Sequence, residues 1–439
     1  MKKIFMVLLA GLLVFSLALS GCAKQQVQQS AQPEQAKTPE EKVDVVKIGA
    51  IFPLTGSAAS TGVKLKYAVE TAEEIINGEH PELDMPLARE AGLPNLGNAK
   101  VKFIFADHQA NPEVAKSEAE RLIQNEKVVG LIGCYHSSAT KPASQVAERF
   151  RIPFVAGSSS SAALTERGLE YFTRIAPNDD METAFFFEYL KYLNATYDAG
   201  IKTIGVAYID NEYGVHAAQM VDKWLKDKYQ GEGFEKVVDV KYPKDLSNVD
   251  TEVQKIKAAK PDAIFHASYI GDITQFVKKY KEFDVVPKAV VNYCGGFQDP
   301  QFVVNLGKDA DFFSGSNATA PSLFAKMDTL NKINEIYKKK SGVDFDGPAL
   351  EDFASAMVIA DAINQAGTID SQKVMEAIKS AVFEAPYFVS GKIKFGKNGQ
   401  NEYSASVMVQ TQNGKYEAVW PVDYQTAEPI PTFPAWKNR

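Results

Sequence analysis

The chain has few of the residues from which metal sites, disulfide frameworks and catalytic triads are built. Its 439 residues include 3 cysteines and 5 histidines, and no pair of histidines has the spacing of metal ligands. His136 lies beside Ser137, but this alone is no triad, and the serines at 158–161 lack the flanking glycine of a nucleophile elbow. Cys134 and Cys294 could pair, but no spacing requires it, so two free thiols are expected. The sequence predicts no enzyme, no metal site and no cofactor.

An excess of positive charge is also missing. The net charge is -7, from 48 lysines and arginines against 55 aspartates and glutamates. No basic domain is present to neutralise phosphates, which excludes nucleic acid as the main partner. A composition of 45% hydrophobic and 23% charged residues is ordinary for a soluble globular protein. The length exceeds what one hydrophobic core usually holds, so two lobes are expected.

The N-terminus has the pattern of a secretory signal. Lys2 and Lys3 precede an apolar run that ends in "LSGC". This ending resembles the bacterial lipobox, which implies a signal peptide over 1–21, cleavage before Cys22 and an acyl (palmitate) anchor on its thiol. An ordinary signal with a chance cysteine is the alternative. Residues 22–44 are polar and Gln-rich and are expected to form a flexible tether.

From residue 45 onward, apolar strands alternate with amphipathic helices. The expected strands include "VVKIGAIFPL", "KVKFIFAD", "VVGLIG" and "IPFVAG", and the helices between them include "GVKLKYAVETAEEIIN" and "PASQVAERF". This alternation indicates a parallel sheet covered by helices on both faces. Residues 77–99 interrupt it with Gly, Pro and Asn and are expected to be a loop insertion.

The same alternation restarts after Asn178 and predicts a second α/β sheet. Residues 323–383 are mostly helical in pattern, and the residues after Gly391 are strand-like. Asn413 and Gly414 are placed as a tight hairpin turn. The fold class expected is α/β, with two parallel sheets in sequence and a tail that returns to them.

Hydroxyl groups gather where two neighbouring strands of the first sheet end. Ligands of open α/β sheets bind beyond the carboxyl ends of the strands. Ser137, Ser138 and Thr140 precede Pro142, which is favoured in the first turn of a helix, and Ser158, Ser159 and Ser160 follow the next strand. Free N–H groups at a helix start attract an anion, so a carboxylate is the expected guest. The alternative is that these hydroxyls only cap helices.

Two tyrosines stand at corresponding junctions of the second series. Tyr213 and Tyr269 could cover the apolar body of a ligand and offer hydroxyls to its polar end. Each taken alone could equally be an ordinary half-buried tyrosine.

The chain resembles the leucine/isoleucine/valine-type (type I) periplasmic binding proteins of ABC importers. The resemblance covers about residues 45–420 and rests on the order of "IGAIFPLTGSAASTG", "VVGLIGCYHSSATKPASQVAE", "IPFVAGSSSSAALTERG", "DNEYG" and "GGFQDPQFV". It implies two Rossmann-like lobes with parallel sheets, joined by three crossover strands and closing on a small molecule. Lobe 1 would comprise 45–176 and 321–400, and lobe 2 would comprise 177–320 and 401–439.

The resemblance also implies roles for single residues. Ser137, Ser158 and Ser160 match the groups that hold the carboxylate of an amino acid. Tyr213 matches a tyrosine over the ligand, and a tyrosine near Tyr269 helps bind the ammonium group. Thr61 falls where a side chain touches the apolar part of the ligand.

One departure from the family pattern concerns the ammonium group. Amino-acid-binding members place a glutamate at the next junction, where this chain has "NYCGGFQDP". Asp299 is the only acid nearby, and it could instead cap the helix after Pro300. Burying an ammonium without a counter-charge costs several kcal/mol. A carboxylate without an amine, such as an aromatic acid, and an amide-type solute therefore remain compatible.

The expected function is that of a lipid-anchored, monomeric solute receptor on the extracytoplasmic face of the cell membrane. It would capture a small carboxylate-bearing ligand, an amino acid or a related solute, and deliver it to an ABC permease. A ligand sensor that acts through a partner signalling protein is the alternative.

Overall fold

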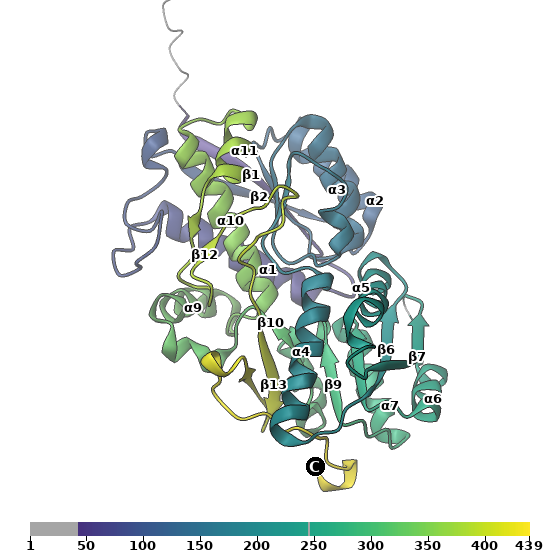
Figure 1. Ribbon diagram of the computed structural model, residues 1–439. Helices are drawn as coiled ribbons and strands as arrows, with labels where there is room; N and C mark the ends of the chain where they lie inside the picture. The colour runs from purple at the N-terminus through teal and green to yellow at the C-terminus, as the bar shows by residue number, and fades with distance from the viewer. Residues whose placement is uncertain (1–42, 245) are drawn as a thin grey trace, which may run out of the picture. The chain divides into compact units, whose positions relative to one another are not determined.

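The computed structural model describes residues 43–244 and 246–439, and these form two sheets of mainly parallel strands with helices packed on them (Figure 1). The predicted signal peptide, Cys22 and nearly all of the predicted tether lie outside the described residues. No helix of the described part is long and apolar enough to cross a membrane.

The first sheet has five strands, all parallel, in the order β2-β1-β3-β4-β5. The strands are β1 (Val45–Phe52), β2 (Lys100–Asp107), β3 (Leu131–Gly133), β4 (Phe154–Ala156) and β5 (Phe172–Arg174). Its helices are α1 (Ala59–Asn77), α2 (Pro112–Gln124), α3 (Ser137–Phe150), α9 (Asp328–Ser341), α10 (Gly347–Ala366) and α11 (Ser371–Ser380). Two short strands, β11 (Phe383–Glu384) and β12 (Lys392–Ile393), pair with each other.

The strands of the first sheet are apolar because the sheet is covered on both faces. In β1, Ile48 and Ala50 belong to the core under α1 and α10, whereas Ile51 belongs to the core under α2 and α3. All three side chains are fully buried. Successive side chains of a strand point to opposite faces, so a strand buried on both faces needs a continuous apolar run.

The second sheet has seven strands in the order β14-β13-β10-β9-β8-β6-β7. They are β6 (Thr203–Ile209), β7 (Glu235–Tyr242), β8 (Ala263–Ala267), β9 (Ala289–Asn292), β10 (Ser314–Asn317), β13 (Val407–Gln412) and β14 (Lys415–Trp420). Strand β13 runs antiparallel to β10, and β14 runs antiparallel to β13. The helices of this part are α4 (Asp179–Tyr197), α5 (Glu212–Trp224), α6 (Asp250–Ala259), α7 (Ile270–Glu282) and α8 (Gln301–Leu306).

The chain crosses between the sheets after β5, after β10 and again before β13. The first and third crossings lie side by side, because Asn401 donates its backbone N–H to the carbonyl of Arg174 at 3.1 Å and its side chain to Ile175 at 3.1 Å. Helix α10 packs on α1, β3 and β4, and so the helical residues after β10 return to the first sheet. We propose that the chain divides into lobe 1, residues 45–176 and 321–400, and lobe 2, residues 177–320 and 401–439, as this packing suggests.

Most of the predicted elements are confirmed, including the loop insertion and the hairpin at Asn413 and Gly414, where both residues have positive φ. The predicted start of α3 is wrong. The helix begins at Ser137, and Pro142 lies inside it instead of in its first turn. Strands β5 and β10 were not expected. Strand β10 reads "SGSN", a short polar stretch that has no apolar pattern.

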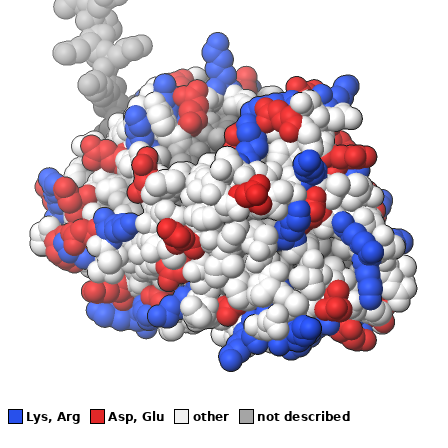
Figure 2. Space-filling model, turned by 60° about the horizontal axis from the view of Figure 1, so that its bottom comes forward, with Lys and Arg blue, Asp and Glu red and all other residues white. Residues whose placement is uncertain are grey.

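Charged residues of both signs are interspersed on the surface shown in Figure 2, without a broad area of one sign.

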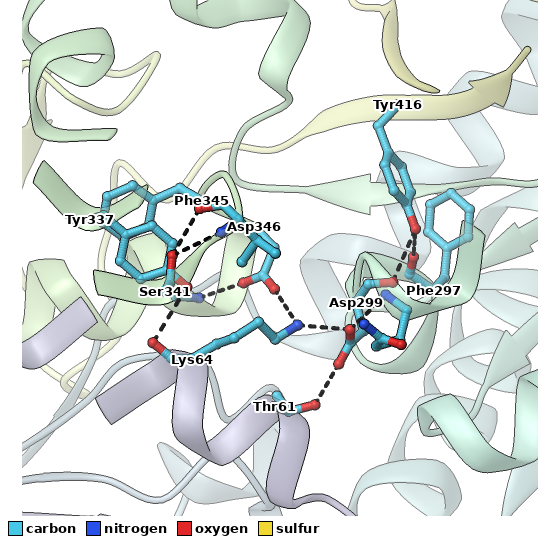
Figure 3. Close-up of polar contacts among 12 residues, drawn as sticks. Thr61, Lys64, Phe297, Asp299, Tyr337, Ser341, Phe345, Asp346 and Tyr416 are labelled. Carbon is cyan, nitrogen blue, oxygen red and sulfur yellow. Dashed lines mark hydrogen bonds and ion pairs between the residues drawn. The ribbon is translucent and has the colours of Figure 1, made fainter. Parts of the chain in front are cut away.

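A buried cluster of charges joins the two sheets (Figure 3). Lys64 of α1 forms ion pairs with Asp299, at 2.7 Å, and with Asp346, at 3.0 Å. Asp299 follows β9 of the second sheet and also accepts a hydrogen bond from Thr61 at 2.8 Å. Asp346 is the N-cap of α10 and accepts from the N–H of Ala349 at 2.9 Å.

This cluster, Lys64 with Asp299 and Asp346, is almost completely buried. The side chains of the three residues are 11%, 2% and 4% exposed, respectively. Burial lowers the pKa of Lys64, but the two carboxylates raise it by more, so the net pKa lies above its ordinary value. The lysine thus remains charged and holds together two carboxylates that would otherwise face each other.

We expect Lys64→Met to destabilise the protein by about 3–5 kcal/mol, because it leaves two buried carboxylates without their cation. The matched control is Lys66→Met on the same helix, whose partner Glu70 is about as exposed as Lys66 itself, at 31% and 33%. Such a surface pair is worth less than about 1 kcal/mol. Urea unfolding at pH 7 measures both variants, and equally small losses would show that the buried cluster does not hold the sheets together.

Candidate functional site

The carboxyl ends of strands from both sheets meet around one small cavity, which we call the inner cavity. Its volume is about 10 Å³, roughly the room of one water molecule. It is lined by Tyr135, Ser137, Ser158, Ser160, Tyr213, Tyr269, Cys294, Gly295 and Pro348. Five of the predicted site residues are therefore brought together, and residues from both sheets line the same cavity.

The remaining predicted residues lie elsewhere. Ser138 and Thr61 line a second, larger cavity of about 370 Å³, which we call the outer chamber. Ser159 lines neither: its hydroxyl lies 2.6 Å from that of Thr140 and donates to the carbonyl of Tyr135 at 3.2 Å. Thr61 donates to Asp299, so its hydroxyl is already engaged in the buried charge cluster.

Ser137 is the first residue of α3, and this position gives it a free donor. Its Oγ accepts the N–H of Ser161 at 3.2 Å, which leaves its own hydroxyl proton available. In the first turn, the N–H groups of Ala139 and Thr140 donate to the carbonyl of His136 at 2.9 Å. This leaves the N–H groups of Ser137 and Ser138 to face a ligand at the positive end of the helix dipole. The corrected start of α3 therefore places the N-terminus of the helix at the cavity itself, five residues before Pro142.

Ser158 and Ser160 differ in what they can offer. Ser158 donates to the carboxylate of Asp352 at 2.7 Å, so its only proton is used within the protein. Ser160 gives its carbonyl to the N–H of Asp179 at 2.9 Å, and its hydroxyl lies near the carboxylate of the same residue. Ser137 is thus the hydroxyl that is best placed to donate to an anion.

Arg174 holds the loop after β4, which carries the serines at 158–161, in place. Its guanidinium donates to the carbonyls of Ser159 and Ser161, at 3.2 and 2.6 Å, and to the side-chain oxygen of Gln400 at 2.6 Å. All of these acceptors are uncharged. Because Arg174 is fully buried and lies at the first crossing, it ties the loop after β4 to the connection between the sheets.

Two buried acids lie directly behind the cavity wall, and no pattern in the sequence marks them as part of the site. Asp179 lies behind Ser160, and Glu182 accepts a hydrogen bond from Ser316 and lies against Cys294. They are 0% and 2% exposed. The Ser160 hydroxyl is the polar side chain near the Asp179 carboxylate, no ideal hydrogen bond is formed there, and one oxygen of Glu182 has no hydrogen-bond partner among the described residues. In the sequence they resemble ordinary acids in the first turn of a helix, which hides their position.

Burial controls the protonation of both acids. Burial raises the pKa of Asp179 to about 8 and that of Glu182 to about 7, and the charge of Glu182 adds to the rise at Asp179. The positive charge of Arg174 offsets only part of this rise. A positive group placed in the cavity would favour the ionised form of both acids.

Aromatic rings form the rest of the wall. Tyr213 donates its hydroxyl to the carbonyl of Cys294 at 2.5 Å, and its ring centroid lies 5.4 Å from that of Tyr269. Gly295 has φ 145°, and a Cβ there would lie 2.9 Å from the carbonyl of Ser268 and 3.1 Å from the Tyr213 hydroxyl. The family position of the missing glutamate is thus occupied by small residues that let Tyr213 approach closely.

The two remaining cysteines, Cys134 and Cys294, are both buried and free, as expected. Asp299 caps the residues after Pro300, accepting the N–H of Gln301 at 2.9 Å, and its pairing with Lys64 leaves it no role as a counter-charge in the cavity.

The chain matches known proteins over most of its length. The family model described as periplasmic binding protein matches residues 45–415. The Leu/Ile/Val-binding protein homolog 7 of Brucella suis biovar 1 is 28% identical over 390 residues, covering 86% of this chain and 91% of the relative.

Two solved structures share the fold. One is the branched-chain amino acid transporter substrate-binding protein LivJ of Streptococcus pneumoniae in complex with isoleucine, with a TM-score of 0.70, 19% identity and coverage of 85% and 98% of the two chains. The other is an ABC transporter solute-binding protein of Rhodopseudomonas palustris in complex with 3,4-dihydroxybenzoic acid, with a TM-score of 0.68, 22% identity and coverage of 85% and 95%. From the extent of the family match, together with two sheets that meet at one cavity, we conclude that the chain belongs to the periplasmic binding protein family, whose members bind solutes for transporters and are not enzymes.

Proposed function

We propose that the protein captures a small solute bearing a carboxylate, an amino acid or a close relative, and delivers it to an ABC permease. The observation that carries this proposal is Ser137, which offers a free hydroxyl proton at the start of α3 inside the inner cavity. A helix N-terminus with a hydroxyl donor suits a carboxylate.

The acids behind the wall favour a ligand that also carries a positive group. Asp179 and Glu182 are buried without a cation paired to them by hydrogen bonds among the described residues. An ammonium in the cavity would supply the missing charge, and the acids would supply what the absent family glutamate supplies elsewhere. This argument favours an amino acid over a simple acid.

An aromatic acid is the second candidate, and the aromatic wall supports it. The rings of Tyr135, Tyr213 and Tyr269 line the cavity, and the ring centroid of Tyr269 lies 5.8 Å from that of Tyr135 and 5.4 Å from that of Tyr213. Such rings stack well on an aromatic ligand. The related protein with 3,4-dihydroxybenzoic acid shows that the fold can bind this class of solute.

We expect Ser137→Ala to weaken binding of the acid form of the ligand on the order of tenfold to a hundredfold, because a hydrogen bond to a charged group is worth about 1.5–3 kcal/mol. The N–H groups of α3 remain, so binding should persist. A thermal-shift screen with amino acids and aromatic acids identifies a ligand, and calorimetry then compares it with its neutral amide in wild type and variant.

The control for this experiment is Ser117→Ala, which removes an exposed hydroxyl on α2 that only bonds to its own helix. It should leave the affinities for acid and amide unchanged. The carboxylate assignment fails if the wild type binds the amide as tightly as the acid and Ser137→Ala does not discriminate between them.

We further propose that the protein acts as a monomer anchored on the extracytoplasmic face of the cell membrane through a lipid on Cys22, as its "LSGC" sequence implies. One acyl chain gives only marginal membrane binding, so stable anchoring requires more than one chain on Cys22. Cys22→Ser should shift the protein from the membrane fraction to the soluble fraction of cells. Unchanged membrane association of this variant, measured by fractionation and immunoblotting, would rule the anchor out.

A further inference from the structure

The inner cavity and the outer chamber share one wall. Tyr135 and Tyr269 line both cavities, one of about 10 Å³ and the other of about 370 Å³. The two rings touch, with centroids 5.8 Å apart and planes tilted by 50°. They come from different sheets, since Tyr135 follows β3 and Tyr269 follows β8.

The backbone holds Tyr135 in this wall. Its φ of 71° lies in the left-handed region, which a bulky side chain rarely adopts and which persists only where the surroundings enforce it. The residue is 7% exposed, and its ring also packs edge-on against His136 at 5.0 Å. The position of the ring is therefore determined by the fold and not by free rotation at a surface.

The other walls of the inner cavity are fixed by hydrogen bonds. Tyr213 is bonded to the carbonyl of Cys294, and Ser158 is bonded to Asp352 of α10. Behind Ser160 lies the buried acid Asp179. Between Tyr135 and Tyr269 there is a contact of rings, and beyond it lies the outer chamber of about 370 Å³. These two rings are therefore the part of the wall that separates the inner cavity from the outer chamber.

We propose that Tyr135 sets the longest ligand that the inner cavity accepts, by closing it off from the outer chamber. This inference rests on the proposed function, because it assumes that a carboxylate-bearing solute binds in the inner cavity, which must widen from its present volume of about 10 Å³ to admit that solute. It adds the substrate class: a compact acid whose body ends at the Tyr135–Tyr269 wall. Removing the Tyr135 ring would join the two cavities and admit a solute longer by about one ring.

The experiment compares a short and a long member of each candidate class by calorimetry. The amino-acid pair is leucine and biphenylalanine, and the aromatic-acid pair is benzoate and biphenyl-4-carboxylate. Wild type should prefer the short member of the pair that it binds. In Tyr135→Ala the long-to-short ratio of affinities should rise about tenfold or more, since even one methylene in a tight pocket changes affinity by about that factor.

Two further variants make the result specific to the wall. Tyr135→Phe keeps the ring and should restore the length limit. Tyr269→Ala opens the same wall from the second sheet and should raise the ratio as Tyr135→Ala does, and it serves if Tyr135→Ala does not fold. Tyr197→Ala, at the far end of α4, controls for the loss of any tyrosine ring.

The outcomes separate this inference from the function on which it rests. A ratio that is the same in Tyr135→Ala, Tyr269→Ala and wild type overturns the length limit and leaves the carboxylate site intact. If no member of either pair binds wild type or any variant, the proposed function is wrong and the length limit falls with it.

Discussion

Buried negative charge is the constraint on which the region between the two sheets depends. Asp179, Glu182, Glu351 and Asp352 are each at most 3% exposed, and Arg174 is the buried cation among them. A charge out of water is expensive unless it is paired, so such groups take up protons instead. Burial accordingly raises the pKa of all four acids, that of Asp352 to about 7. The site is thus poised to respond to any charge that enters it.

The same region solves the problem of buried charge in two ways. Lys64 pairs with Asp299 and Asp346, which satisfies three charges and links α1 and α10 to the second sheet. No lysine or arginine of the described residues forms an ion pair with Asp179 or Glu182, and both acids lie behind the residues that line the inner cavity. The paired group serves the structure, whereas the unpaired group is available to a ligand. On this account, a positive group that binds between the two sheets reduces the free-energy cost of burying the charges of Asp179 and Glu182.

The fold could be predicted from the sequence because the apolar patterns that indicate it lie within single segments of the chain. The site could be predicted only in part. Ile48, Ala50 and Ile51 indicate a strand that is buried on both faces, and the hydroxyl groups after β3 and β4 indicate the cavity. Strand β10 could not be seen, since its small polar residues are buried only by tertiary packing. The bond from Ser158 to Asp352 joins residues 194 positions apart, and no local pattern predicts that it uses up the serine's proton. Asp179 resembles a helix-capping acid until the fold buries it, and Tyr135 has no feature in the sequence that marks it as a wall.

The central claim is that the buried acids act on the charge of the ligand, and the protons exchanged on binding test it most directly. At pH 7 both Asp179 and Glu182 are partly protonated, with pKa values of about 8 and about 7. A bound ammonium lowers both values, so binding must release protons and affinity must rise between pH 6 and pH 8. Calorimetric titration with leucine at pH 7, in buffers of different ionisation enthalpy, measures the number of protons released or taken up on binding. The account predicts net release of protons, and it would be contradicted by net uptake, by no exchange or by the absence of binding.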